Sequence, residues 1–153
     1  ADAISRTTIT APDHTFTGRV ELDLGGRTAV LLHPGRAHTD HDVVVHVPDA
    51  AVVFAGDVVE HAEAGFSEFS FSDETDLTAW PDTFDAILAL EPRVVVPGHG
   101  DPVDAAFVRY HRDGLHELIT LKAGVGRGET TEVAAVAASR YPSDVTLAAL
   151  ATP

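Results

Sequence analysis

Three short segments of this sequence carry the histidine and aspartate side chains that could do chemistry, and each borders a predicted strand. The first contains His38 and His41 and enters a valine-rich run; the second places Asp57 after a glycine, and the third places His99 between two glycines. Loops at strand ends are where sheet proteins often assemble their sites, and a neighbouring glycine leaves room for a bound ion. Each segment alone also fits a surface turn, so their order along the chain is what favours a common site.

The kinds of side chain available restrict which metals could bind. The chain has nine histidines and no cysteine, which excludes disulfides and thiolate zinc sites. Any transition metal must therefore be held by imidazole and carboxylate groups. Such ligands suit zinc, and also iron or manganese.

Charge and hydropathy exclude several classes of partner. Asp and Glu number 24 against 10 Lys and Arg, for a net charge of −14, which repels nucleic acids and anionic membranes. No apolar run approaches the roughly 18 residues that a membrane span needs. We also find no signal-peptide pattern. The compartment stays open, and a soluble, cytoplasmic protein is favoured over a secreted one.

The elements that must position these residues can be predicted from hydrophobic patterns. Period-two alternation around Gly25-Gly26 predicts a hairpin, and continuous valine runs predict strands covered on both faces. The predicted strands cover residues 20–24, 27–32, 43–47, 51–54 and 93–96. Apolar residues at spacings of three and four predict helices. These cover residues 78–90, 103–123, 131–141 and 145–151, and residues 61–75 lack a period and predict a long loop.

This order of elements indicates a single α/β (α+β) domain over residues 1–153, with a sheet backed by helices. Trp80 and Phe84 share the first predicted helix and are expected in the core. Three phenylalanines in the long loop could line a pocket or cover a sheet edge, and a core position is the preferred prediction. They are Phe66, Phe69 and Phe71.

Together, the three segments resemble motifs of the metallo-β-lactamase superfamily of metal-dependent hydrolases, over about residues 20–118. Gly35-Arg-Ala-His38-Thr39 looks like the third motif, Phe54-Ala-Gly56-Asp57 like the fourth and Val96-Pro-Gly98-His99-Gly100 like the fifth. The resemblance implies that His38 binds a first metal, that Asp57 bridges two metals and that His99 binds the second. It implies hydrolysis of a small-molecule substrate by a metal-activated hydroxide. Esters, thioesters, lactones, lactams and phosphoesters are all substrates of this superfamily.

One family signature is absent. The His-x-His-x-Asp-His segment that precedes the third motif occurs nowhere in the chain. The chain therefore looks like the C-terminal half, one sheet–helix half, of the four-layer αββα fold. Each of the two zinc ions would receive only two ligands here, where a catalytic zinc normally has three. We expect the missing ligands to come from an N-terminal half, and the isolated chain to self-associate or to fold poorly.

Other interpretations stay open at this point. His41 stands where the family commonly has glycine, and His61 lies four residues after Asp57, so either could contact substrate or the metal ligands. The chain could instead be a catalytically incomplete half-domain that acts as a binding or interaction module. A third possibility is a local metal site made from His38, Asp40 and His41.

Overall fold

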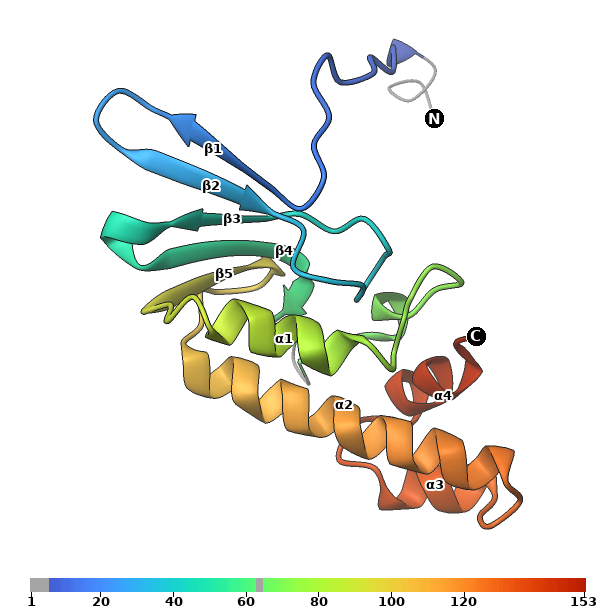
Figure 1. Ribbon diagram of the computed structural model, residues 1–153. Helices are drawn as coiled ribbons and strands as arrows, with labels where there is room; N and C mark the ends of the chain where they lie inside the picture. The colour runs from blue at the N-terminus through green and yellow to red at the C-terminus, as the bar shows by residue number, and fades with distance from the viewer. Residues whose placement is uncertain (1–5, 63–64) are drawn as a thin grey trace.

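A computed structural model describes residues 6–62 and 65–153 as a five-stranded sheet backed by helices (Figure 1). The strands are β1 (Arg19–Asp23), β2 (Thr28–Leu32), β3 (Val44–Val47), β4 (Val52–Glu60) and β5 (Val94–His99). They lie in the order β1-β2-β3-β4-β5. The first four strands pair antiparallel, and β4 pairs with β5 in parallel. The sheet is therefore mixed, as the α/β prediction allows.

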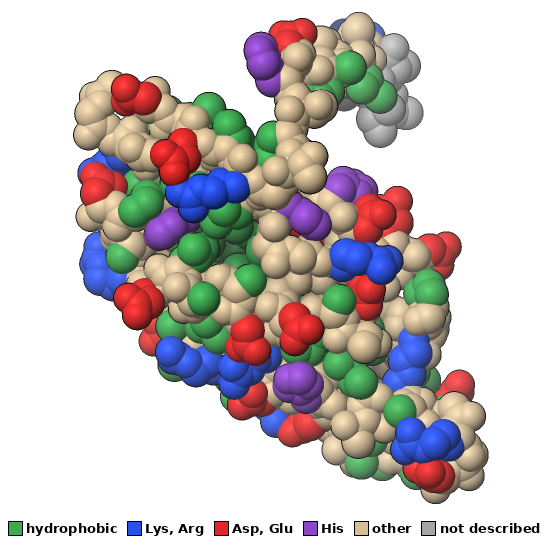
Figure 2. Space-filling view, viewed as in Figure 1, with side chains coloured by type: hydrophobic (Ala, Val, Ile, Leu, Met, Phe, Trp, Pro, Cys, Tyr) green, Lys and Arg blue, Asp and Glu red, His purple; other side chains and the backbone are tan. Residues whose placement is uncertain are grey.

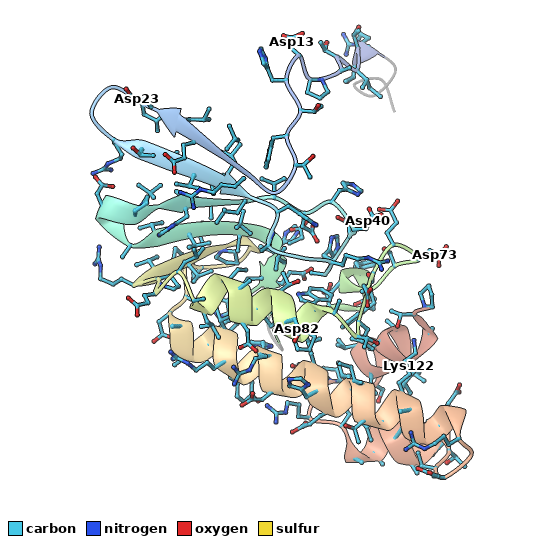
Figure 3. All side chains as sticks on the ribbon, in the orientation of Figure 1. Asp13, Asp23, Asp40, Asp73, Asp82 and Lys122 are labelled. Atoms are coloured by element: carbon cyan, nitrogen blue, oxygen red, sulfur yellow. The ribbon has the colours of Figure 1, made fainter. Side chains whose placement is uncertain are left out.

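Four helices follow the antiparallel strands. They are α1 (Trp80–Leu88), α2 (Ala105–Gly126), α3 (Glu132–Ala138) and α4 (Ser143–Ala151), with short 3-10 helices η2 (Pro48–Ala50) and η3 (Glu68–Ser70). Helix α1 makes the crossover between the parallel strands, and Figure 1 shows α1 and α2 side by side below the sheet. On α2, Lys122 points toward the end of α4 (Figure 3), where its Nζ donates to Thr152 Oγ1 at 2.7 Å. This contact ties the last helix to the longest one.

The predicted elements are all found, with three differences. The predicted helix over 131–141 ends at Ala138, because Ser139 adopts an extended backbone. The predicted loop over 61–75 contains η3. Strands β4 and β5 run on to Glu60 and His99, past their predicted ends at residues 54 and 96. Asp57 and His99 therefore lie within strands, and the prediction that they follow strands was wrong.

The core lies between the sheet and the helices. Val53 of β4 and Val95 of β5 are fully buried in one cluster with Trp80 and Phe84 of α1, which confirms the core prediction for these two aromatic residues. The indole N–H of Trp80 donates to the carbonyl of Val58 at 3.0 Å, so the helix is also bonded to β4. Phe66 and Phe71 are buried as predicted, whereas Phe69 is 80% exposed and the core prediction was wrong for it.

The other face of the sheet, here called the open face, is apolar along every strand. The strand register places these side chains on it: Val20, Leu22, Ala29, Leu31, Val45, Val47, Val52, Phe54, Val94 and Val96. Phe54, at its centre, is 45% exposed and Leu22 is 44% exposed. Ala29 is buried, but α1 to α4 lie on the opposite side of the sheet (Figure 1), so within the described residues helices cover one face of it. The valine runs predict strands covered on both faces, and helices of residues 6–62 and 65–153 cover one of the two faces.

On the face shown in Figure 2, Lys and Arg side chains are dispersed among Asp and Glu. Within the described residues, no helix has the length and apolarity to cross a bilayer.

We expect the chain to self-associate through the open face, because burial of apolar surface is favourable and soluble monomers rarely expose large apolar patches. Phe54→Lys places a charge at the centre of that face and is expected to shift sedimentation toward the monomer. Val133→Lys adds the same charge at an exposed position on α3 and should change nothing. A wild-type chain that sediments as a monomer at its highest reachable concentration would contradict this expectation.

Candidate active site

His38 is presented by the loop between β2 and β3, which the segment around α1 holds in place. The Thr83 hydroxyl donates to the carbonyl of Arg36 at 2.8 Å, and the Thr75 hydroxyl donates to the carbonyl of His38 at 3.1 Å. The imidazole ring meets the edge of Trp80, with ring centroids 6.1 Å apart. His38 is thus half-buried in a loop whose backbone is bonded on the side of α1.

Figure 3 locates this loop relative to the rest of the sheet. Asp40, in the same loop, lies at the end of the sheet opposite Asp23, which ends β1. Asp73, in the segment that follows η3, lies at the same end as Asp40. The loop after β2 and the segment after β4 therefore meet at one end of the sheet.

Asp57 and His99 come together across the parallel strands β4 and β5. The Oδ1 atom of Asp57 lies 3.4 Å from Nε2 of His99. The β4 ladder is irregular here, and Gly56 has a φ of +56°, which a glycine adopts without strain. Gly98 is equally required, because a Cβ there would overlap Oδ1 of Asp57 and lie 2.8 Å from its backbone nitrogen. Two glycines thus allow the carboxylate and the imidazole to approach.

The three predicted ligands line one cavity of about 530 Å³. Its walls are His38, Asp57, Glu60, Ala62, Ser67, Phe69 and His99. Residues up to 61 positions apart in sequence therefore border the same cavity at one end of the sheet.

Glu60 is the site residue that sequence reasoning missed. It ends β4, is only 6% exposed, and its Oε2 accepts a hydrogen bond of 2.7 Å from the buried Ser70 hydroxyl. Burial raises the pKa of this carboxyl, the charge of Asp57 raises it further, and the Ser70 bond opposes both effects. A signal existed: Glu60 is an acid after two valines and three residues beyond Asp57.

The two additional histidines do not line this cavity. His41 is exposed and paired with Asp40, whose Oδ1 lies 2.6 Å from Nδ1; this hydrogen bond raises the pKa of His41 and lowers that of Asp40. The backbone N–H of His61 donates to the carbonyl of His99 at 2.9 Å, and its ring packs on Phe107. His61 therefore helps to hold the end of β5, where His99 lies.

The predicted ligands are of the chemical type that divalent transition metals accept, but there are too few of them for each metal ion. Two imidazoles and a carboxylate are the ligands that zinc, iron and manganese accept. Within residues 6–62 and 65–153, however, no group of three or more His, Asp or Glu side chains is arranged to hold a metal ion. A catalytic zinc normally takes three protein ligands. The same finding disfavours a local site made from His38, Asp40 and His41.

The fold is that of one part of a metallo-β-lactamase. A metallo-β-lactamase from Pontibacter korlensis superposes with a TM-score of 0.63 at 25% identity, over 76% of this chain and 54% of its own. The structure of TMB-1 gives a TM-score of 0.60 at 24% identity, over 78% of this chain and 54% of its own.

Sequence comparison identifies the family. The metallo-β-lactamase superfamily model matches residues 4–99. A type 2 metallo-β-lactamase from Bacteroides fragilis is 31% identical over 110 residues, which are 71% of this chain and 43% of that protein. This chain belongs to the metallo-β-lactamase superfamily, and it spans about half the length of the relatives it matches.

A buried histidine anchors the segment that forms one wall of the cavity. His111 on α2 is 3% exposed, packs against Phe66 and lies so close to Gly65 that a Cβ there would overlap its ring. Burial lowers the pKa of His111 to about 4, with smaller contributions from the charges of Arg140 and His61. The ring is therefore neutral in the folded protein at neutral pH.

Gly98→Ala is expected to separate Asp57 from His99, because the new methyl group collides with the Asp57 carboxylate and backbone. The free energy of unfolding should fall by about 1–3 kcal/mol, as for other overpacked sites. Gly126→Ala, at the C-terminal end of α2, adds the same methyl group where no atom lies within 4 Å of the new Cβ. This variant should be as stable as the wild type or slightly more stable. Urea unfolding of the two variants measures this difference, and equal stabilities would contradict the close packing.

Acid should destabilise the chain through His111. Well above pH 6.5 the ring is neutral in both states; as the pH falls through 6.5 toward 4, the unfolded chain binds a proton that the folded chain excludes. The free energy of unfolding is expected to drop by about 3 kcal/mol over this window. His111→Phe should remove this part of the slope in urea unfolding curves recorded from pH 7 to 4. His116→Phe, at an exposed position on the same helix, should keep it; equal slopes would contradict the assignment.

Proposed function

We propose that this chain is the C-terminal half of a metal-dependent hydrolase. The observation that carries the proposal is that His38, Asp57 and His99 line one cavity although three separate segments supply them. Membership of the superfamily supports the same assignment. In this proposal His38 holds a first zinc, Asp57 lies between two zinc ions and His99 holds the second; iron or manganese would suit the same donors.

The residues of this chain have defined tasks in such an enzyme. When bound, the metal supplies an activated water at neutral pH and polarises the substrate's carbonyl or phosphoryl oxygen. Thr75 and Thr83 hold the His38 loop, Gly98 admits the Asp57 carboxylate, and His61 fixes the carbonyl of His99. Contacts within this chain therefore position all three donor residues.

The shortage of metal ligands and the uncovered open face both support a missing second half of the fold. The described donors fall below three per metal, and the open face lacks a covering layer. A second sheet–helix half that carries His-x-His-x-Asp-His would correct both deficits at once. We infer that this half comes from the same gene or from another chain, and that the isolated chain hydrolyses nothing at an enzymatic rate.

The substrate in this proposal is a small ester, thioester, lactone, lactam or phosphoester. A second candidate function, a non-catalytic interaction module, is favoured by the open face, which by itself could recruit another protein. The two functions differ in whether metal binding and hydrolysis appear when the second half is supplied.

Zinc binding and turnover test the proposal. We expect weak zinc binding by the isolated chain, followed through the fluorescence of its single tryptophan, Trp80, which meets the His38 ring. Co-expression with a segment bearing His-x-His-x-Asp-His should tighten zinc binding and produce turnover in a screen of nitrocefin, lactone, thioester and phosphodiester substrates.

Matched variants separate site from surface effects. His99→Gln and Asp57→Asn should each reduce zinc affinity about tenfold or more, which corresponds to the loss of one ligand interaction of about 1.4 kcal/mol. His116→Gln removes an exposed histidine elsewhere and should have no effect. Chelator-resistant zinc on the isolated chain, or turnover without the second half, would contradict the half-domain proposal. Zinc binding and turnover that stay absent in the complex would favour the interaction module.

A further inference from the structure

A second cavity, of about 290 Å³, lies between the segment after β4, one side of α2 and the segment after α3. The described residues of its lining are His61, Ala62, Gly65, Phe107, Tyr110, His111, Arg140 and Tyr141. None of these residues lies on the open face, none is a predicted metal ligand, and only Ala62 also lines the first cavity. This second cavity is therefore formed without bound metal and without a second half of the fold.

Close packing holds the second cavity in shape. Gly65 approaches His111 so closely that a Cβ there would overlap the imidazole ring, and a Cβ on Gly114 would overlap the Tyr141 hydroxyl. Gly114 lies within α2, where glycine is less favourable than alanine. The glycine at this position lets Tyr141 pack onto the helix, so the wall of the cavity is already formed in the free chain.

Aromatic rings make up most of this wall. Phe107, Tyr110 and His111 follow the helical spacing of α2, and the ring centroids of Phe107 and His111 lie 4.3 Å apart. The Tyr141 ring packs beside His111, and the guanidinium of Arg140 lies over the Tyr110 ring at 4.7 Å. Rings in this arrangement can contact the face or the edge of another aromatic ring. The cavity therefore suits a planar aromatic ligand.

The described lining offers no unpaired charge to an ionic ligand. Arg140 Nε donates to a carboxylate oxygen of Glu117 at 2.7 Å, and its Nη2 is bonded to the other oxygen. Burial lowers the pKa of His111 and raises the pKa of Tyr141, so both side chains are uncharged at neutral pH. A carboxylate would lack a free cation, and an ammonium group would meet Arg140. An uncharged ligand fits these groups best.

Two imidazole nitrogens of this lining have no hydrogen-bond partner among the described residues. The carbonyl of Asp101, 3.0 Å from Nδ1 of His61, can only accept, so Nδ1 donates and a neutral His61 has a lone pair at Nε2. Nδ1 of His111 is bonded to the Tyr141 hydroxyl at 3.3 Å, which leaves its Nε2. Because His111 is only 3% exposed, a ligand that hydrogen-bonds there would satisfy a buried polar group.

We propose that the second cavity binds an uncharged, planar aromatic compound that carries an N–H or O–H donor, a class that includes indoles, phenols and nucleobases. The rings of α2 and of Tyr141 contact the compound, and Nε2 of His61 or His111 accepts its hydrogen bond. A volume of about 290 Å³ is at the small end for ligand sites and suits one or two fused rings. The inference goes beyond the proposed hydrolase, because it uses none of the predicted metal ligands.

Equilibrium dialysis of three probes against the whole chain tests the inference, since this readout does not depend on the oligomeric state. The probes are indole, 1-methylindole and indole-3-carboxylate. We expect indole to bind at least about threefold more tightly than 1-methylindole, which lacks the donor, and than the anionic carboxylate. Non-specific binding to the open face would favour the more apolar 1-methylindole. No saturable binding of indole, or a smaller or reversed preference, overturns the proposal.

Two exposed aromatic residues provide matched variants. Tyr110→Ala removes one wall of the second cavity and should weaken indole binding at least about fivefold, as for the loss of an aromatic contact. Phe69→Ala removes an exposed ring that lines the first cavity instead, and should change indole binding less than twofold. Equal effects of the two variants overturn the proposal. If Tyr110→Ala does not fold, the ranking of the probes on the wild-type chain and the result for Phe69→Ala still decide.

The same dialysis separates this inference from the proposed function. In a complex with a segment bearing His-x-His-x-Asp-His, indole should bind with an affinity within twofold of that of the isolated chain. Loss of indole binding in that complex places the probe on the covered open face and overturns the inference. Zinc binding and turnover without indole binding support the hydrolase and contradict the second site, and indole binding without turnover gives the opposite result.

Discussion

The parallel pairing of β4 with β5 is the constraint on which the rest of this structure depends. It brings Asp57 within 3.4 Å of His99, extends both strands beyond their apolar segments and leaves Glu60 at the end of β4 beside them. Parallel strands need a crossover, and α1 supplies it. The same helix segment then holds the His38 loop through Thr83, so that one connection serves both the fold and the site.

Close packing around this pair explains why small residues recur there. Gly98 faces Asp57, and Gly100 and Gly65 lie against His61 and His111, where any side chain would overlap its neighbour. The glycines therefore do more than turn the chain. They let the segments after β4 and β5 approach closely enough to enclose a cavity with carboxyl and imidazole groups on its walls.

In the half-domain proposal, the open face and the incomplete donor set share one physical origin. In a sandwich of two sheets, each sheet buries one face against helices and the other against its partner, and ligands gather at the shared edge. This chain has the helix-covered face complete, with Val53 and Val95 fully buried, while Phe54 at the centre of the opposite face is half-exposed. A chain that spans about half the length of its relatives and lacks the His-x-His-x-Asp-His segment has this combination of features.

The sequence by itself determined the type and order of the elements and the family, and it predicted the three donor residues. Period-two and helical patterns are local, and His38, Asp57 and His99 each sit in a short motif with adjacent glycines, so no distant contact was needed to recognise them. Only the tertiary structure decided that β4 reaches Glu60, that Phe69 lines a cavity while Phe66 is buried, and that His61 braces a strand instead of facing that cavity. Those outcomes depend on pairing between β4 and β5 and on packing against α2, which join residues 38 or more positions apart. A single-sequence pattern carries no information about such non-local contacts, because each residue's local neighbours are compatible with several packings.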